Sequence, residues 1–156
     1  MSMLNDKMTI NSSDIAIQSF CNFIDGFARQ GTYKMNVMQI MLNRGYEDWF
    51  RPLSANMIAK EYYDLVRKQS EEHSLNGIAK IFQESFSQKE IERHLNSLPF
   101  KALTIESPRT GRSPFENANG KLIVREEYCI PTKQAHAAIQ LAVENKLEDY
   151  FEMKQK

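Results

Sequence analysis

The sequence predicts a mainly helical α+β fold, in which a β-hairpin and a long final helix follow a group of helices. Apolar residues recur at steps of three and four along most of 12–98 and again along 132–151, which indicates amphipathic helices. Between residues 100 and 130 they alternate instead with polar residues, as in half-exposed strands. Hydrophobic residues make up 42% and charged residues 26% of the 156 positions, a balance typical of a folded globular protein.

Length and composition also bound the domain organisation and the compartment. The chain suits one domain over 12–156, preceded by a polar, flexible arm over 1–11. Cys21 and Cys129 are too few and too far apart for a disulfide framework, and their apolar neighbours indicate free thiols. The first residues lack a secretory signal, and no apolar run approaches the roughly 20 residues that cross a bilayer. We therefore expect a cytoplasmic protein without membrane contact.

Local signals place the helices. Serines at 12–13 can cap the first helix, and Gly31 lies beyond its end. The second helix is apolar on several sides and must be largely enclosed, whereas the third, capped by Ser54, has one apolar face. Ser87 and Glu90 match a capping box at the start of a later helix. The predicted helices span 12–27, 33–43, 54–68, 75–84, 88–98 and 132–153.

Two strands are predicted after Pro99, which is expected to stop the helix over 88–98. Phe100–Glu106 alternates apolar and polar residues, and Lys121–Ile130 is its expected partner. The link over 107–120, SPRTGRSPFENANG, is rich in Pro, Gly, Ser and Asn, which predicts an irregular loop. The segment therefore reads as a hairpin with a long connection.

Residues 54–130 supply the order helix, helix, helix, strand, loop, strand, and in this the chain resembles the winged-helix (helix-turn-helix) superfamily. The phrase HLNSLPFKALTIE is similar to winged-helix modules carried by some restriction endonucleases and regulators. The resemblance implies a winged-helix-like core over 54–130, with 88–98 as the recognition helix and 107–120 as the wing. The chain departs from the usual pattern in a turn without glycine, 84–87, and in a longer wing. Many members of the superfamily bind protein instead of nucleic acid, so function must be argued from the site.

Candidate nucleic-acid-binding residues lie on the helix 88–98 and around the wing. On the helix they lie off the face formed by Ile91 and Leu95, and Gln, Arg and Asn are side chains that read base edges. Twenty basic residues balance twenty acidic ones overall, yet positive charge is concentrated within 101–125. The alternative is a solvated helix face beside an ordinary basic loop. The candidates are Gln88, Lys89, Arg93, Asn96, Arg109, Arg112 and Lys121.

Two functions fit this pattern. The first is a non-enzymatic DNA-binding protein, such as a small regulator, that uses the helix 88–98 and the basic wing 107–120. The second is a protein-binding adaptor or inhibitor that acts through the final helix 132–153, also a candidate homodimer contact, or through the aromatic loop 46–52. The other interpretation of that loop, which carries Trp49 and Phe50, is a plug in the core.

An enzyme is not expected, because the sequence offers no nucleophile, base and orienting group that belong together. The histidines His73, His94 and His136 are far apart and lack partners at metal-ligand spacing. Glycine-rich phosphate-binding motifs do not occur. We therefore expect neither a metal nor another cofactor.

Overall fold

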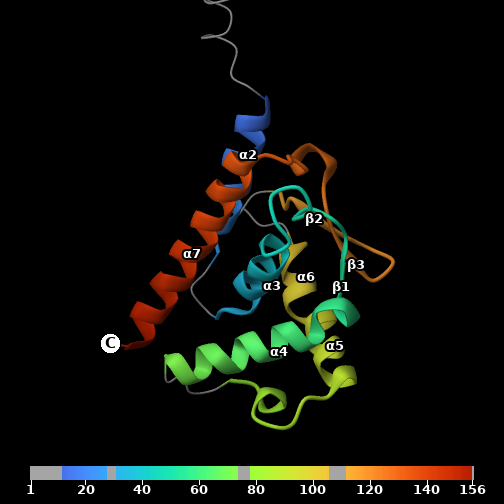
Figure 1. Cartoon of the computed structure of the whole chain (residues 1–156), viewed down its shortest axis with the longest axis vertical. Helices are drawn as coiled ribbons and strands as arrows, with labels where there is room; N and C mark the ends of the chain where they lie inside the picture. Colours follow the sequence, from blue (N-terminus) through green and yellow to red (C-terminus); the bar gives the residue numbers. More distant parts are fainter. Residues whose placement is uncertain (1–11, 28–30, 74–77, 106–111, 156) are drawn as a thin grey trace, which may run out of the picture.

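Helices dominate the computed structural model, which describes residues 12–27, 31–73, 78–105 and 112–155 (Figure 1). The mainly helical α+β class predicted from the sequence is confirmed, whereas the predicted arm over 1–11 lies outside the described residues. In chain order the elements are α2 (Ser12–Asp25), α3 (Tyr33–Leu42), β1 (Leu53–Ser54), α4 (Ala55–Glu72), the 3-10 turn η1 (Lys80–Phe82), α5 (Gln88–Ser97), α6 (Pro99–Leu103), β2 (Phe115–Ala118), β3 (Lys121–Val124), the 3-10 turn η2 (Glu126–Tyr128) and α7 (Lys133–Gln155).

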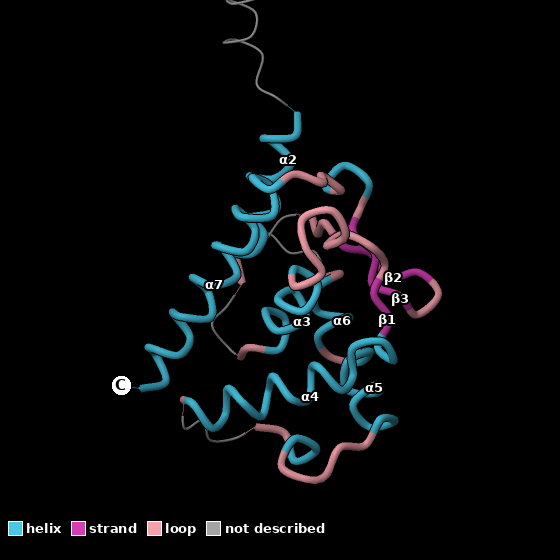
Figure 2. The backbone as a smooth tube through the Cα atoms, in the orientation of Figure 1, coloured by secondary structure: helices cyan, strands magenta, loops and turns pink. Residues whose placement is uncertain are grey.

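The long helix α7 lies beside α2, and the two run in the same direction along one flank of the molecule (Figure 1). The Cys21 thiol donates to the carbonyl oxygen of Ala138 at 3.6 Å, and further along both helices Lys146 Nζ donates to the carbonyl oxygen of Asp25 at 2.8 Å. Helix α3 packs between α7 and α4, while α4 and α5 pair at the opposite end, and the strands stand at one side (Figure 2). The strands thus lie between the pair formed by α2 and α7 and the pair formed by α4 and α5 (Figure 2).

The core contains aromatic side chains from segments far apart in the sequence. Trp49 is fully buried, and its indole Nε1 donates to the carbonyl oxygen of Ile130 at 3.2 Å. The ring of Phe20 meets those of Trp49, Phe115 and Tyr128 edge to face, with centroid separations of 5.7, 5.4 and 5.7 Å. These contacts join α2, the aromatic loop, the hairpin and η2. The loop is therefore a core plug, and Trp49 is not an exposed docking anchor.

A three-stranded antiparallel sheet has the order β1-β3-β2 (Figure 2). The two-residue turn Asn119-Gly120 joins β2 to β3, and both residues have positive φ, 54° and 77°. Positive φ at both turn positions matches the twist of a tight hairpin, and Asn and Gly accept it at low cost. Strand β1 pairs with β3 so that Ser54 lies opposite Lys121, which ties the hairpin to the start of α4.

The first strand of the predicted hairpin, Phe100–Glu106, is wrong. Its residues up to Leu103 belong to α6, which begins at Pro99. Proline suits the first turn of a helix because the N–H that it lacks would have no intrahelical acceptor there. Phe100 and Leu103 are both buried, one helical turn apart. The strand that pairs with β3 is β2, which the sequence analysis assigned to an irregular loop, and the second strand ends at Val124.

Residues 75–77 of the helix predicted over 75–84 lie outside the described residues. In the described remainder, 78–84, the short turn η1 takes the place of the predicted helix. The predictions of α2, α3, α4, α5 and α7 are confirmed. Ser54 precedes α4 as predicted, but its hydroxyl donates to the side-chain oxygen of Asn56 at 2.6 Å and does not cap the helix. The enclosed position expected for α3 is also confirmed, because seven of its ten residues are buried.

A buried polar pair fixes the register of α3 against α4. The Asn36 and Gln69 amides exchange two hydrogen bonds, with N–O distances of 2.8 and 2.7 Å, and Asn36 Nδ2 also donates to Thr32 Oγ1 at 3.2 Å. Asn36 is fully buried and Gln69 is 7% exposed. Each amide satisfies the hydrogen-bonding groups of the other, so both can be buried without loss. Only one alignment of α3 against α4 allows both hydrogen bonds, and the pair therefore sets the register of the two helices.

Replacing one member of this pair should cost more stability than replacing both. Gln69→Met leaves the Asn36 amide without its main partner, and we expect the free energy of unfolding to fall by about 1–3 kcal/mol. The single variant Asn36→Leu should likewise lose stability, whereas the double variant Asn36→Leu/Gln69→Met removes both polar groups and should lose less than either single variant. Urea unfolding of the four proteins measures the coupling, and additive losses would contradict the account.

Candidate nucleic-acid interface

Helix α5 is defined at its start by a side-chain cap and along its length by two different faces. The Ser87 hydroxyl accepts a hydrogen bond from the Glu90 backbone N–H at 3.4 Å, so the predicted N-cap is confirmed. Ile91 and Leu95 are fully buried, one helical turn apart. The inward face of α5 therefore corresponds to the apolar positions of the sequence, and the polar positions lie outside.

His94 strengthens this attachment from the middle of the helix. Its ring is 7% exposed, and His94 Nε2 lies 2.9 Å from the hydroxyl oxygen of Tyr62 on α4. The rings of Tyr33 and Phe82 meet the imidazole edge to face, with centroids 4.7 and 5.0 Å away. Burial lowers the pKa of His94 from 6.5 to about 4, so the ring is neutral at pH 7. Sequence reasoning considered His94 only as a metal ligand and missed this anchoring role.

The outward face of α5 presents Lys89, Arg93 and Asn96, all of them exposed. Spacings of four and three residues bring these side chains into one stripe on the helix surface. Within the described residues, no hydrogen bond or ion pair engages the three side chains. Two cations and one amide thus form a stripe that faces solvent, with Glu90 and Glu92 at its edges, on a helix whose opposite side is fixed in the core.

Gln88 and Lys121 approach one another through the segment at the start of α4. Gln88 Nε2 donates to the backbone oxygen of Asn56 at 3.2 Å and to Glu92 Oε2 at 2.6 Å. Lys121, which is exposed, pairs in the sheet with Ser54, two residues before Asn56. The turn end of the hairpin and the first turn of α5 therefore adjoin the same short segment, 54–56. The amide of Gln88, however, is already engaged within the protein.

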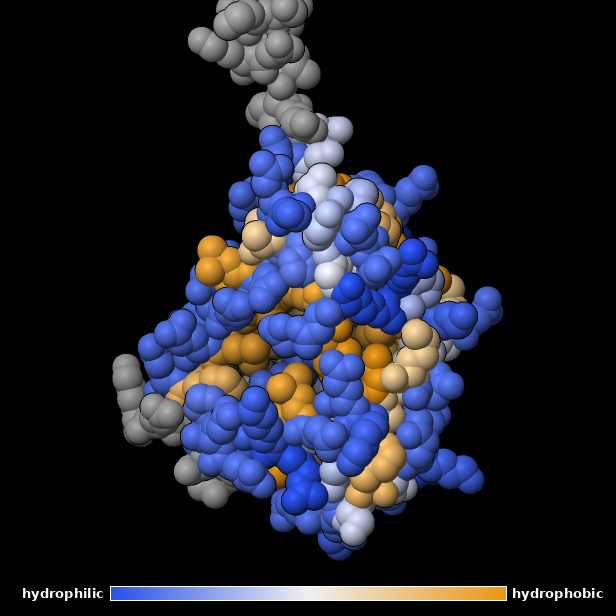
Figure 3. Space-filling view, in the orientation of Figure 1, coloured by the Kyte–Doolittle hydropathy of each residue, from blue (hydrophilic) through white to orange (hydrophobic). Residues whose placement is uncertain are grey.

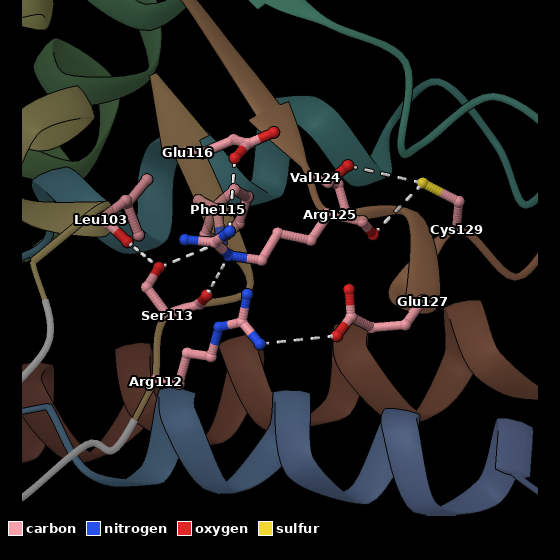
Figure 4. Close-up of polar contacts among 9 residues, drawn as sticks. All are labelled: Leu103, Arg112, Ser113, Phe115, Glu116, Val124, Arg125, Glu127 and Cys129. Carbon is pink, nitrogen blue, oxygen red and sulfur yellow. Dashed lines mark hydrogen bonds and ion pairs between the residues drawn. The ribbon is translucent and has the colours of Figure 1, made fainter. Parts of the chain in front are cut away.

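Arg112 lies apart from this group. It precedes β2 at the other end of the hairpin from the turn, and its guanidinium NH1 lies 4.0 Å from Glu127 Oε2 (Figure 4). That end of the hairpin packs on α2, as the contact between Phe20 and Phe115 shows. The sequence analysis placed Arg112 and the helix 88–98 in one nucleic-acid-binding surface. The structure instead places Arg112 away from α5. Arg109 lies outside the described residues.

Polar contacts around Ser113 fix the end of the hairpin where Arg112 lies (Figure 4). The Ser113 hydroxyl donates to the carbonyl oxygen of Leu103 and accepts from the Phe115 backbone N–H at 3.0 Å. Arg125 Nε donates to the Ser113 carbonyl oxygen at 2.8 Å, and its NH1 lies 3.3 Å from Glu116 Oε2. Arg125, counted among the basic residues of this region, therefore supports the hairpin.

The face between α4 and α7 has a different character. Apolar surface gathers between these helices in Figure 3, where a hollow of about 350 Å³ is lined by His73, Leu147 and Phe151. The rings of His73 and Phe151 stack with centroids 3.7 Å apart. Three glutamates on α7 also line this hollow and would repel a polyanion, so it is a poor nucleic-acid site. They are Glu144, Glu148 and Glu152.

Comparison of the chain with models of protein families, with curated proteins and with solved structures found no match. Among the described residues, no group of three His, Cys, Asp or Glu side chains is arranged to hold a metal ion. None of the described helices combines the length and the apolar character needed to traverse a bilayer. The function of the protein therefore has to be inferred from the geometry around α5.

The buried imidazole predicts a pH dependence of stability. In the unfolded chain His94 takes up a proton near pH 6.5, whereas in the folded protein it does so only near pH 4. The unfolded state binds more protons between these values, so the free energy of unfolding decreases as the pH falls from about 6.5 to about 4. The contribution of this one group is about 3 kcal/mol, because one pKa unit corresponds to about 1.4 kcal/mol.

The variant His94→Gln is the matched comparison, because its amide can still hydrogen-bond the Tyr62 hydroxyl but does not titrate. Urea unfolding across this pH range should show a steeper loss of stability in the parent than in the variant. Carboxylate titrations are common to both proteins and cancel in the difference. Parallel loss in the two proteins would show that His94 is not held neutral by burial.

Proposed function

We propose that the protein is a non-enzymatic, DNA-binding protein that presents the outer face of α5 to the nucleic acid. The observation that carries the proposal is the stripe of exposed side chains formed by Lys89, Arg93 and Asn96, on a helix whose other side is buried. A rigidly held helix with cationic and amide side chains suits entry into the major groove. A small cytoplasmic regulator, as the sequence analysis expected, fits such a role.

The arrangement around α5 supports this proposal electrostatically. The chain has no net charge, so attraction to a polyanion has to be local. Lys89 and Arg93 place positive charge on the outer stripe of α5, while Glu90 and Glu92 lie at the two edges of that stripe. Lys121 adds a cation at the turn end of the hairpin, beside the start of α4. Phosphate contacts of this kind would provide most of the affinity, and Asn96 would contribute to sequence preference.

The order of elements supports a winged-helix-like role. The expected core over 54–130 contains α4 and α5 before its hairpin, with the short turn η1 between them in place of the expected second helix and α6 as an added connection. Helix α3, which precedes that core, supplies the third helix of the order. In this proposal α5 is the recognition helix, and residues 115–124 replace 107–120 as the wing. Arg112 is left out of the interface because its guanidinium lies beside Glu127, away from α5.

Removing the two α5 cations should weaken DNA binding strongly. We expect Lys89→Ala/Arg93→Ala to lower the affinity for a random duplex about tenfold or more, since two cations that would neutralise phosphates are lost. The slope of log affinity against log salt should also become shallower by about two, one for each lost phosphate contact. Fluorescence anisotropy of a labelled duplex across a salt series measures both quantities.

The matched control is Lys68→Ala/Arg112→Ala, which removes the same number of positive charges away from α5. Lys68 lies 3.9 Å from Glu72 on α4, and Arg112 lies beside Glu127. The control should keep the affinity and the salt slope of the parent. Equal losses in the two double variants would indicate that net charge alone matters, and absence of duplex binding by the parent would refute the proposed function.

The alternative role, a protein-binding adaptor or homodimer, would use α7, either on its outer side or at the hollow that it lines beside α4. Ile139, in the first half of this helix, is fully buried, whereas Leu141 is 57% and Met153 is 39% exposed. Isolated exposed apolar side chains are common on protein surfaces and do not by themselves indicate an interface. We expect light scattering to give a monomer. A dimer that the substitution Leu141→Asp dissociates, in a protein that binds no duplex, would favour the alternative.

A further inference from the structure

A second cationic surface lies beside the start of α4, in a part of the chain that the sequence analysis did not consider for nucleic-acid binding. A shallow hollow of about 550 Å³ is lined by Arg44, Asp48, Arg51, Pro52 and Met57. Two guanidinium groups thus meet a single carboxylate in its lining. Arg51 and Met57 are both exposed, and Met57 has 62% of its surface accessible.

Arg44 shapes this hollow and keeps donors in reserve. Its NH1 donates to the carbonyl oxygen of Arg51 at 2.6 Å, and its NH2 donates to that of Pro52 at 3.3 Å. These bonds use two of the five N–H groups of a guanidinium. Among the described residues, no carboxylate lies within ion-pair distance of Arg44. Burial, and then the charge of Arg51, lower the pKa of Arg44, an effect that Asp48 and Glu61 oppose without cancelling it.

Arg51 forms an exposed ion pair with Asp48, which a phosphate can replace as its partner. Its Nε lies 2.6 Å from Asp48 Oδ1, and the two side chains are 69% and 45% exposed. An ion pair this exposed is worth about 1 kcal/mol or less, because water screens it and both side chains lose freedom in it. A phosphate can therefore compete with Asp48 for the guanidinium at little cost, and it would accept hydrogen bonds in a planar, bidentate arrangement.

The hollow also adjoins the interface described above. Met57 follows Asn56, whose backbone oxygen accepts the hydrogen bond from Gln88, and Pro52 precedes β1, in which Ser54 pairs with Lys121. The segment 51–57 therefore connects the arginine hollow, the hairpin and the start of α5.

We propose that the hollow formed by Arg44, Arg51 and Met57 binds a phosphodiester group of the same nucleic acid whose bases face α5. This inference rests on the proposed function and adds a backbone contact to it. Arg51 contacts the phosphate, Arg44 positions the 51–52 backbone and supplies further donors, and Met57 packs against the sugar. Contacts of this kind fix the register of a protein on its duplex without reading sequence.

Two substitutions at one ion pair should change binding in opposite directions. We expect Arg51→Ala to lower duplex affinity about three- to tenfold and to reduce the salt slope by about one, since one phosphate contact is lost. Asp48→Asn removes the competing carboxylate and should raise affinity by a similar factor. Fluorescence anisotropy measures both effects with a labelled random duplex, and thermal unfolding confirms that each variant is folded.

The control for Asp48→Asn is Glu47→Gln, which changes the net charge equally at a neighbouring exposed carboxylate that does not line the hollow. It should leave affinity near that of the parent. Equal gains for the two substitutions, or parental affinity for Arg51→Ala, would overturn the inference. If Arg51→Ala binds like the parent while Lys89→Ala/Arg93→Ala is weakened, only the hollow is wrong. If the parent binds no duplex, the proposed function fails with it.

Discussion

The neutral imidazole of His94, held against the Tyr62 hydroxyl, fixes α5 to the rest of the protein. Ile91 and Leu95 supply apolar burial on either side, but apolar contacts alone are not directional, whereas the hydrogen bond and the edge-to-face rings of Tyr33 and Phe82 set the rotation of the helix. That rotation decides which side chains are outside. If α5 turned by a third of a revolution, Arg93 and Asn96 would no longer share the exposed stripe.

A second constraint is the short segment from Arg51 to Met57. This segment contains β1, the start of α4 and part of the lining of the arginine hollow. Gln88 and the hairpin both contact it. Elements separated by 70 or so residues are therefore positioned relative to one another through one piece of backbone, as the pairing of Ser54 with Lys121 illustrates. Side chains on rigid elements are placed more accurately than side chains on loops, and this favours α5 as the centre of the binding surface, with the hairpin turn and the hollow at its margin.

Sequence reasoning succeeded where a local signal determines the structure. The apolar periodicity gave α2, α3 and α7, and Ser87 with Glu90 gave the start of α5. Sequence reasoning failed at Pro99, which was expected to end a helix and instead begins α6. A proline is common both after the end of a helix and at its first position, so the residue alone does not distinguish the two. The dipeptide Asn119-Gly120 is a strong hairpin signal that went unused. Local sequence signals could not show that Arg112 lies beside Glu127, or that Arg44 lines a hollow, since both depend on long-range packing.

The central claim, that the outer face of α5 contacts nucleic acid, is tested most directly by following backbone amide resonances while a short duplex is added. The account predicts that the largest shifts fall within 89–97 and around the hairpin turn at 118–121, with a smaller group at 51–57 and little change along α7. Shifts concentrated on α7 or around Arg112, or no shifts at all at low salt, would contradict it.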